Sequence, residues 1–249
     1  MVAAGSAAIA QPNAKVLAVN PRAVLGRLPV PLKQRLIRLP GRVGYGWGAN
    51  LMSELRKRWI LLRHPHATIR FEGPVRLGRR ARVQIPGHGT LIVGPNVEIR
   101  SDCLIEIEGR GRVAIGEGTI LNVGAILGCS TSLELGRRCI IGPHAYISDG
   151  SHSYAGDMSK PFMERGYDYA VVQLGDDAAV ATKCTVTASV GEKSMVAANS
   201  VVRTPIPPLY GTGGVPARLI MYLGPEETEP EEGKRQRLAY EASRVRPGA

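Results

Sequence analysis

The sequence predicts an all-β fold, a parallel β-helix, and three features of its repeat carry the prediction. From Val93 onward an apolar residue recurs at every sixth position, in blocks such as VGPNVE, LGRRCI and IGPHAY. The residue after it is often Gly, and the fifth residue of the block is mostly small. A six-residue period fits neither an α-helix nor a simple two-sided strand, whereas a short fixed period implies stacked identical units. Each hexad therefore forms one flat face with its aliphatic residue pointing inward.

Three hexads are expected to close one triangular coil of about 18 residues, with the aliphatic residues of neighbouring coils stacked on one another. The pattern has four extra residues after IEIEGR and two before LGRRCI, and the block VTAS is two residues short. The small fifth position holds Cys103, Cys139 and Cys184, which predicts a packing role for these thiols in tight corners. The sequence contains no CxxC pair, so a zinc ribbon is not expected.

The chain before the repeat is expected to differ from it. Residues 1–20 are predicted to be disordered and to contain no signal peptide, because a basic n-region and a long apolar h-region are missing. Residues 21–66 are predicted to form a basic helical or irregular region. Within it LKQRLIRL (32–39) and LMSELRKRWILLR (51–63) have the pattern of short amphipathic helices, separated by the glycine-rich GRVGYGWG (41–48). Their apolar faces are expected to pack on the first coils or on a lipid surface.

The β-helix is expected to occupy residues 67–223, with an inserted loop at 153–173. A loop of this length is usually functional or disordered. We expect it to line the site rather than to be a merely ordered surface loop, because its aromatic rings suit stacking on a sugar or a wall for an acyl chain. These rings belong to Tyr154, Phe162, Tyr167 and Tyr169. The tail, 224–249, is polar, opens with the acidic PEETEPEE, and is predicted to be flexible.

The positive charge is concentrated in the first third of the chain. Between Arg22 and Arg82, 15 Lys and Arg residues face two Glu residues, which gives +13 out of a total net charge of +11. This favours either a solvated basic face or docking on an anionic membrane surface or acidic glycolipid. Nucleic acid is not expected, because no basic motif interleaved with aromatic residues is present. Since no apolar run approaches the roughly 20 residues of a membrane span, a cytoplasmic protein, peripheral at the inner face of the membrane, is expected.

Two stretches of the repeat are similar to a known family. In NVGAILGCSTSLELGRRCIIGPHAYISDGSH the order and spacing of Asn122, Leu135-Gly136, Ile141-Gly142-Pro143 and His152 resemble the hexapeptide-repeat acyltransferases. The branch that it resembles contains the maltose, galactoside and polysaccharide O-acetyltransferases. The stretch VAANSVVRTPIPPLYGTGGVPARLI resembles the family ending AGSVVTKDVPP…GVPAKVI. The resemblance implies a left-handed parallel β-helix, a homotrimer with active sites between subunits, and acetyl-CoA or another acyl-CoA as co-substrate, without a metal.

The resemblance also implies roles for individual residues. His152 matches the histidine that deprotonates the acceptor hydroxyl, a role that suits an imidazole because its pKa is near neutral. Asp149 has the chemistry to hold and orient that imidazole, or else it caps a turn. Asn122 matches the acceptor-binding position, and its alternative is an asparagine ladder or corner residue. Where the maltose-type enzymes carry an acceptor-gripping aspartate, this chain has Cys129, which argues against maltose, galactoside and similar small sugars.

The acyl-CoA site is the part of the resemblance with the most departures. The family ending places Thr182 and Ala198 beside the pantetheine, and Arg203, Thr204 and Arg218 near the nucleotide end. Arg203 stands where the family more often has Thr, and Thr204 where it has Lys, so the cation is shifted by one position. The usual tryptophan in the hexad after the loop is Ala179 here. An acyl donor other than acetyl-CoA therefore stays open.

Three classes of function are compatible with this fold. The first is an acyl-CoA-dependent O-acyltransferase, most simply an O-acetyltransferase, that modifies a saccharide such as a polysaccharide or glycolipid intermediate. The second is a non-catalytic β-helix scaffold. The third is a zinc-dependent carbonic anhydrase, which needs three histidines that converge across a subunit boundary. His144 and His152 are eight residues apart and His88 lies far upstream, so this spacing argues against the third class.

Overall fold

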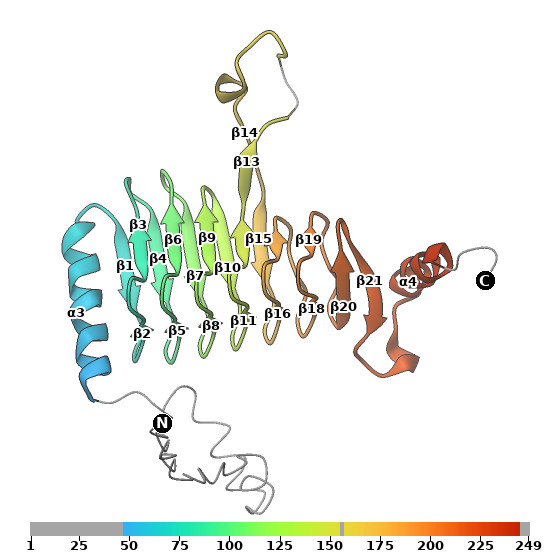
Figure 1. Ribbon diagram of the computed structural model, residues 1–249, viewed down its shortest axis with the longest axis horizontal. Helices are drawn as coiled ribbons and strands as arrows, with labels where there is room; N and C mark the ends of the chain where they lie inside the picture. Colours follow the sequence, from blue (N-terminus) through green and yellow to red (C-terminus); the bar gives the residue numbers. More distant parts are fainter. Residues whose placement is uncertain (1–46, 155–156, 245–249) are drawn as a thin grey trace, which may run out of the picture. The chain divides into compact units, whose positions relative to one another are not determined.

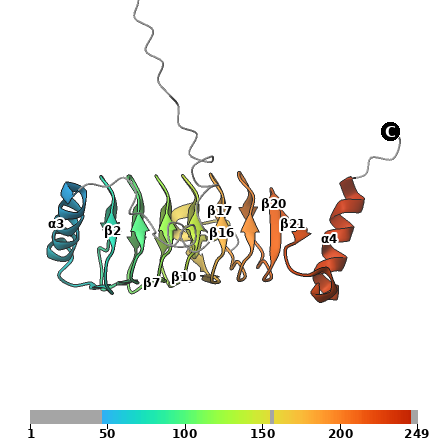
Figure 2. The same cartoon turned by 90° about the horizontal axis from the view of Figure 1, so that it is seen from below.

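The computed structural model describes residues 47–154 and 157–244, which belong to one unit of the chain, Gly44–Ala249. Within this unit, parallel strands form a row of coils between helix α3 (Trp47–Arg63) and helix α4 (Glu231–Arg244) (Figures 1 and 2). This architecture confirms the predicted parallel β-helix. The segment 1–20 and the predicted helix at 32–39 lie outside the described residues.

Each coil contributes one strand to each of three sheets, which we call A, B and C. Sheet A contains β1 (Thr68–Phe71), β4 (Thr90–Val93), β7 (Arg112–Ile115), β10 (Ser132–Leu135) and β15 (Val171–Leu174). Sheet B contains β2 (Arg76–Leu77), β5 (Glu98–Ile99), β8 (Ile120–Leu121), β11 (Ile140–Ile141), β16 (Ala179–Val180), β18 (Met195–Val196), β20 (Tyr210–Gly214) and β21 (Ala217–Tyr222). Sheet C contains β3 (Arg82–Gln84), β6 (Leu104–Ile107), β9 (Ile126–Cys129), β12 (Tyr146–Ser148), β17 (Thr185–Val186) and β19 (Val201–Val202).

The coils are not equal in length. The register partners Thr68, Thr90 and Arg112 in sheet A mark two coils that are both longer than three hexads. The coils that follow the inserted loop, marked in sheet B by Ala179 and Met195, are shorter than three hexads. The prediction of a uniform coil of three hexads is therefore wrong, but the lengths follow the inserts and the deletion seen in the sequence.

The difference in length is located in one part of the coil. Strands β6 and β9 have four residues each, whereas β17 and β19 have two each. These four strands belong to sheet C, so the coils lengthen or shorten where sheet C turns into sheet A.

The core is a set of aliphatic columns along the axis of the coils. Along sheet A, the buried residues Leu91, Val113, Leu133 and Val172 occupy equivalent register positions. Such columns bury aliphatic surface in every coil, which stabilises the stack.

The three corner cysteines belong to this core. Cys103, Cys139 and Cys184 fill the inward position at corners, where each thiol donates to a backbone carbonyl of the next coil. Burial raises the pKa of Cys103 and of Cys139 to about 11, which keeps both as unreactive thiols. The predicted packing role of the three cysteines is confirmed.

The second position of the hexad is often glycine for a steric reason. A Cβ on Gly142 would lie 2.5 Å from the carbonyl carbon of Ala181, and one on Gly175 would lie 2.4 Å from the amide nitrogen of Glu192. Side chains at these corners would therefore push neighbouring coils apart, although the coils must approach closely to pair their backbones. The glycine of the repeat thus sets the spacing between coils.

The two ends of the β-helix are covered by helices. Helix α3 begins at Trp47, so part of the glycine-rich stretch expected to be a break is helical. At the other end the tail was expected to be flexible, whereas η2 (Glu226–Thr228) and α4 are formed there. Helix α4 is held because buried Glu229 pairs with Arg237, at 2.8 Å between Oε2 and Nη2. Gly233 also allows the helix to lie against Tyr210, since a Cβ there would overlap the tyrosine hydroxyl.

The inserted loop is a hairpin that projects from the row of coils (Figure 1). Its two strands, β13 (Gly150–His152) and β14 (Tyr167–Tyr169), are antiparallel, and the short helix η1 (Phe162–Glu164) lies between them. Backbone hydrogen bonds close the hairpin at its base, where Ala170 N donates to Asp149 O at 2.7 Å. The chain therefore leaves the row of coils and returns to it at the same place, so that β15 pairs with β10 as the next strand of sheet A.

Candidate functional site

His152 lies on the hairpin, opposite Tyr167 in the antiparallel pairing. Its ring is half-buried, with the Tyr167 ring 4.2 Å away and the Phe162 ring 5.3 Å away between centroids. Nδ1 is enclosed and has no hydrogen-bond partner among the described residues, whereas Nε2 is not among the enclosed atoms. Because buried polar atoms in folded proteins are normally paired, this nitrogen points to a partner supplied by a ligand or by another protomer.

Asp149 occupies an inward position of sheet C and is almost completely buried. One carboxylate oxygen accepts from Ser130 N at 2.7 Å. The other accepts from Thr131 N at 2.8 Å, from the Thr131 hydroxyl at 3.0 Å and from Cys129 Sγ at 3.2 Å. The Thr131 hydroxyl also donates to the backbone oxygen of Ala170, at 3.0 Å. Asp149 therefore fastens the turn of the preceding coil to the base of the hairpin.

The prediction that Asp149 orients His152 does not agree with this geometry. The oxygens of the carboxylate are taken up by residues 129–131, and none of its hydrogen bonds goes to the imidazole. The physical reason is the register of the repeat: Asp149 follows Ile107 and Cys129 in an inward column, while His152 lies beyond the corner on the hairpin. Burial, with Asp149 beside it, raises the pKa of Cys129 to about 12, so this thiol is no nucleophile.

A cavity of about 680 Å³ lies under the base of the hairpin. Asp168 and Tyr169 of the hairpin line it from one side, and Thr187, Val201 and Arg203, from the end of sheet C, line it from the other. Tyr154 and residues 149–151 complete the lining. This cavity has the size of a small-molecule site, with aromatic rings, a carboxylate and a guanidinium at its wall.

Asn122 lies at the corner between sheets B and C, and both ends of its amide are occupied. Nδ2 donates to Ile141 O at 2.9 Å, and Oδ1 accepts from Arg100 Nη1 at 2.6 Å. These contacts join three successive coils, as expected for the corner-residue alternative. Asn122 and His152 are on different corners of the β-helix, so the chain does not bring the two side chains together by a direct contact.

The predicted acyl-CoA residues divide between the same two corners. Thr182 and Ala198 follow β16 and β18, so they continue the corner of Asn122 along the axis, and Thr182 Oγ1 donates to Pro143 O at 2.8 Å. Arg218 lies on β21 opposite Gly213, in the same sheet as those strands. Arg203 and Thr204 follow β19 at the other corner, where Arg203 borders the cavity under the hairpin. One chain thus presents two separate halves of the predicted site.

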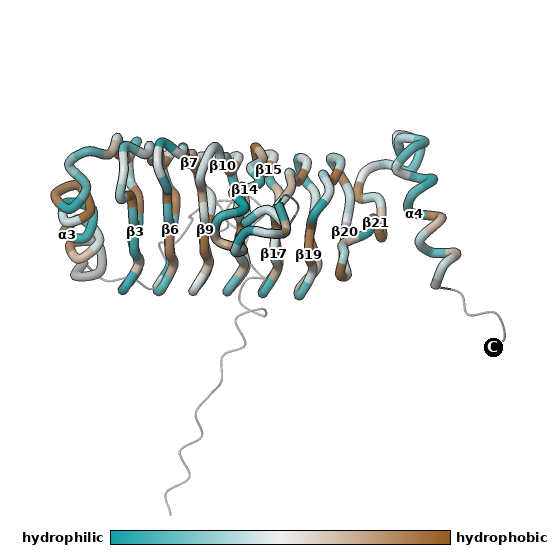
Figure 3. Tube along the Cα trace, turned by 90° about the horizontal axis from the view of Figure 1, so that it is seen from above, coloured by the Kyte–Doolittle hydropathy of each residue, from teal (hydrophilic) through white to brown (hydrophobic). Residues whose placement is uncertain are grey.

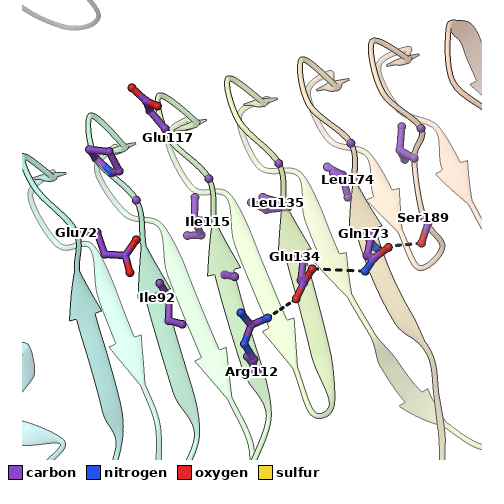
Figure 4. Close-up of a pocket in the computed structure, with 18 of the residues that line it drawn as sticks. Glu72, Ile92, Arg112, Ile115, Glu117, Glu134, Leu135, Gln173, Leu174 and Ser189 are labelled. Carbon is purple, nitrogen blue, oxygen red and sulfur yellow. Dashed lines mark hydrogen bonds and ion pairs between the residues drawn. The ribbon is translucent and has the colours of Figure 1, made fainter.

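A second groove, of about 710 Å³, follows the outer face of sheet A (Figure 4). Outward side chains of successive coils form a polar row in it: Arg112 pairs with Glu134, and Gln173 Nε2 approaches Glu134 Oε2 at 3.5 Å. None of the predicted site residues lines this groove. Its polar row therefore ties neighbouring coils together on a face away from the hairpin.

Sequence reasoning missed the contribution of Ser130 and Thr131, which hold Asp149 through both backbone amides and the threonine hydroxyl. The signal was available in the repeat. Ile107, Cys129 and Ala188 occupy the equivalent inward column, and Asp149 is the acidic member of it. A carboxylate in an aliphatic column needs donors from the adjacent turn, because an unpaired buried charge is strongly unfavourable.

Two further searches covered residues 47–154 and 157–244. Within those ranges, no group of three or more His, Cys, Asp or Glu side chains is arranged to hold a metal ion. In the same part of the chain, no helix has the length and apolar character needed to cross a bilayer.

Comparison with solved structures shows which proteins share this fold. AntD, an N-acyltransferase from Bacillus cereus in complex with dTDP and coenzyme A, superimposes with a TM-score of 0.55 at 18% identity, over 79% of this chain and 97% of AntD. Its complex with dTDP and 3-hydroxybutyryl-CoA gives 0.52 at 17% identity, over 77% and 96%. A hexapeptide-repeat acetyltransferase from Vibrio cholerae, in complex with acetyl-CoA, gives 0.44 at 22% identity, over 69% and 79%.

At these identities the similarity concerns the fold. No protein-family model matches the sequence, and no curated protein matches it significantly. The chain therefore has the parallel β-helix fold that is found in hexapeptide-repeat acyltransferases.

Proposed function

We propose that the protein is an acyl-CoA-dependent O-acyltransferase, in the first instance an O-acetyltransferase, that acts on a hydroxyl of a saccharide. The observation that carries the proposal is His152, whose imidazole has one enclosed, unpaired nitrogen and stands on the hairpin beside the cavity under its base. A shared fold alone does not define an activity, so the assignment depends on this residue and its surroundings. The AntD structures, which are complexes of an N-acyltransferase with coenzyme A compounds, are consistent with it.

The reaction needs one base and no covalent enzyme intermediate. The acceptor oxygen attacks the thioester carbonyl carbon while its proton moves to His152 Nε2. A C–O bond forms, the C–S bond breaks, and the proton passes on to the leaving coenzyme A thiolate. With Nε2 acting as the base, Nδ1 carries the other proton and needs an acceptor. Asp149 does not provide that acceptor, because its oxygens face residues 129–131.

We infer that a second copy of the chain completes the site and that the assembly is a homotrimer. The corner that holds Asn122, Thr182 and Ala198 would face the hairpin and Arg203 of a neighbour. The outer faces of sheets B and C and the corner between them expose apolar side chains that suit such an interface. These are Val123, Ile140, Tyr146 and Met195. Exposed apolar residues gathered on one side of a protein commonly mark an interface between proteins.

The acyl-CoA site is tested most simply through Arg203. We propose that its guanidinium neutralises phosphate of the donor, with Thr204 and Arg218 nearby in the assembled site and with Thr182 and Ala198 along the pantetheine. Arg203→Glu is expected to raise the Kd of acetyl-CoA about tenfold or more in calorimetric titrations, because it replaces a favourable charge by a repulsive one.

The matched control is Arg110→Glu, an exposed arginine in the turn after β6 that lies outside the cavity. Equal weakening by both variants would mean that only net charge matters, and an unchanged Kd for Arg203→Glu would exclude Arg203 from the donor site.

The acceptor and the place of action follow from charge and from the aromatic hairpin. Tyr154 and Tyr169 at the cavity suit stacking on a sugar ring, and the basic first third of the chain suits an anionic surface. We propose that the acceptor is a polysaccharide or glycolipid intermediate. The enzyme would work in the cytoplasm, where acyl-CoA is available, at the inner face of the membrane.

A further inference from the structure

Helix α3 is attached to the β-helix by its polar face rather than by its apolar one. Ser53 accepts from Leu77 N at 2.9 Å and donates to Val75 O at 3.3 Å, and Arg56 Nη1 donates to Leu77 O at 2.9 Å. Ile60 is the one large aliphatic residue of 51–63 that is buried. The opposite face carries large apolar side chains that are exposed. They include Leu51, Met52, Leu55, Trp59 and Leu62.

This orientation is the reverse of what packing within the chain would produce. Positions 51, 55, 59 and 62 follow one another on a single side of an α-helix, so their side chains form a continuous stripe. Trp59 is 62% exposed and Leu62 is 76% exposed, although both would be stabilised by burial. In Figure 3 hydrophobic stretches alternate with hydrophilic ones along α3. An apolar stripe at the end of the β-helix therefore awaits a covering surface.

A basic cavity opens beside this stripe. It has a volume of about 350 Å³ and lies between α3 and the first coils at sheet B. Four arginines and one glutamate line it: Arg56, Arg76, Arg79, Arg100 and Glu98. Met52 belongs both to the lining of the cavity and to the exposed stripe, so the two features form one surface.

The cavity has the chemistry of a phosphate site. Each guanidinium offers five N–H donors in a planar fork that matches two oxygens of a phosphate. Arg56 uses one donor on Leu77 O, and Arg100 directs donors to Glu98 at 3.3 Å and to Asn122 at 2.6 Å. These bonds fix two of the guanidiniums in position, while Arg79 is exposed at the rim. The lining as a whole carries more guanidinium charge than carboxylate charge.

We propose that this surface binds an anionic lipid bilayer, with the apolar stripe of α3 in the interface and a lipid headgroup phosphate in the arginine cavity. The inference rests on the proposed action at a membrane and identifies the site that performs it. A helix that lies in the interface inserts its apolar side among the headgroups, and cations next to it attract anionic lipid. Met52 places the phosphate site at the edge of the stripe, where headgroups of the same leaflet lie.

Charge decides between a lipid surface and other coverings of the stripe. Residues 1–46 contain seven Lys and Arg residues and no Asp or Glu, so they offer no carboxylate to the arginines of the cavity. A second copy of this face would bring together two clusters of like charge. An anionic bilayer supplies both an apolar layer and phosphate groups, and the basic residues 1–46 add to its attraction.

The test is sedimentation of the full-length protein with vesicles of phosphatidylcholine, with and without one-third phosphatidylglycerol. The wild type is expected to bind the anionic vesicles about tenfold more tightly than the neutral ones. Arg79→Glu is expected to weaken binding to anionic vesicles about tenfold, because each basic residue at the surface contributes to attraction. Leu62→Ser is expected to weaken it by a similar factor, through loss of buried apolar area.

The controls are Arg110→Glu and Leu238→Ser, an exposed arginine and an exposed helical leucine away from α3, which should bind as the wild type does. Equal binding to both kinds of vesicle, no binding, or the same loss in the controls would overturn the inference. A change of molecular mass in Leu62→Ser, measured by light scattering, would instead make α3 an interface between copies.

The same proteins are titrated with acetyl-CoA. Intact acetyl-CoA binding without vesicle binding would reject the lipid site and leave the proposed acyl transfer standing. Vesicle binding without acetyl-CoA binding would do the reverse.

Discussion

His152→Ala is expected to lower turnover with acetyl-CoA and a saccharide acceptor about 100-fold or more, the usual scale for loss of a general base. The acceptor hydroxyl would then have to lose its proton to water while it attacks the thioester. Because His152 is assigned to the chemical step, KM for acetyl-CoA should stay within about threefold of the wild type. The measurement is the initial rate of thiol release at several acetyl-CoA concentrations.

Two controls make this result specific. His88→Ala removes an exposed imidazole before β4 that is hydrogen-bonded to His66 O, and it should leave turnover unchanged. Thermal unfolding of His152→Ala should match the wild type within a few degrees, since its ring contacts only hairpin residues. Full turnover in His152→Ala would remove this residue from the mechanism, and a loss accompanied by unfolding would have to be repeated with His152→Asn.

Asp149→Ala is expected to lower the free energy of unfolding by about 2–4 kcal/mol. The substitution leaves Ser130 N and Thr131 N without their acceptor in a buried turn, and unmade bonds to buried donors cost about 1–3 kcal/mol each. It also loosens the base of the hairpin, where Thr131 bridges Asp149 and Ala170. Turnover should therefore fall as well, while the pH profile of the remaining activity keeps the shape set by His152. Urea unfolding followed by circular dichroism measures the first effect.

The matched variant is Asp102→Ala, which removes a partly exposed carboxylate paired with Arg80 at 2.5 Å. Exposed ion pairs contribute at most about 1 kcal/mol, so this variant should be close to the wild type. If Asp149→Ala cost no more than Asp102→Ala, the carboxylate would not be the fastening of the hairpin. If it shifted the pH profile, Asp149 would act on His152 after all.

The repeat made the fold predictable because its period and its corner chemistry leave few alternatives. Each aliphatic hexad position has the same neighbours in every coil, so Leu91, Val113 and Leu133 could be placed in a column without knowledge of the turns. The coil lengths were less predictable. Extra residues lengthen strands β6 and β9 of sheet C, and a count of residues does not reveal which turn absorbs an insert.

The orientation of α3 shows what a pattern cannot decide. The amphipathic sequence of 51–63 indicates two faces, but not which face packs on the coils. In the structure the polar face is chosen, because Ser53 and Arg56 satisfy the open backbone groups of β2 at the end of the β-helix. The apolar face is left for a surface that does not belong to the described part of this chain.

The candidate site was predictable in its parts and not in its assembly. His152 stands where the end of its hexad and the start of the inserted segment placed it. Asn122 pairs with Arg100 of the preceding coil, and this pairing depends on the length of that coil. The partners of Asp149 depend likewise on the previous coil, and the acceptor for His152 Nδ1 does not come from residues 47–154 or 157–244.

Mass spectrometry of candidate saccharides and glycolipids, incubated with the full-length protein and acetyl-CoA, tests acyl transfer most directly. The account predicts that one acceptor gains the mass of one acetyl group, that free thiol appears in equal amount, and that both signals are lost with His152→Ala. A panel of longer acyl-CoA donors in the same experiment covers a different acyl group. Acetyl-CoA binding with no acylated product from any donor and acceptor, or product formed equally by His152→Ala, would contradict it.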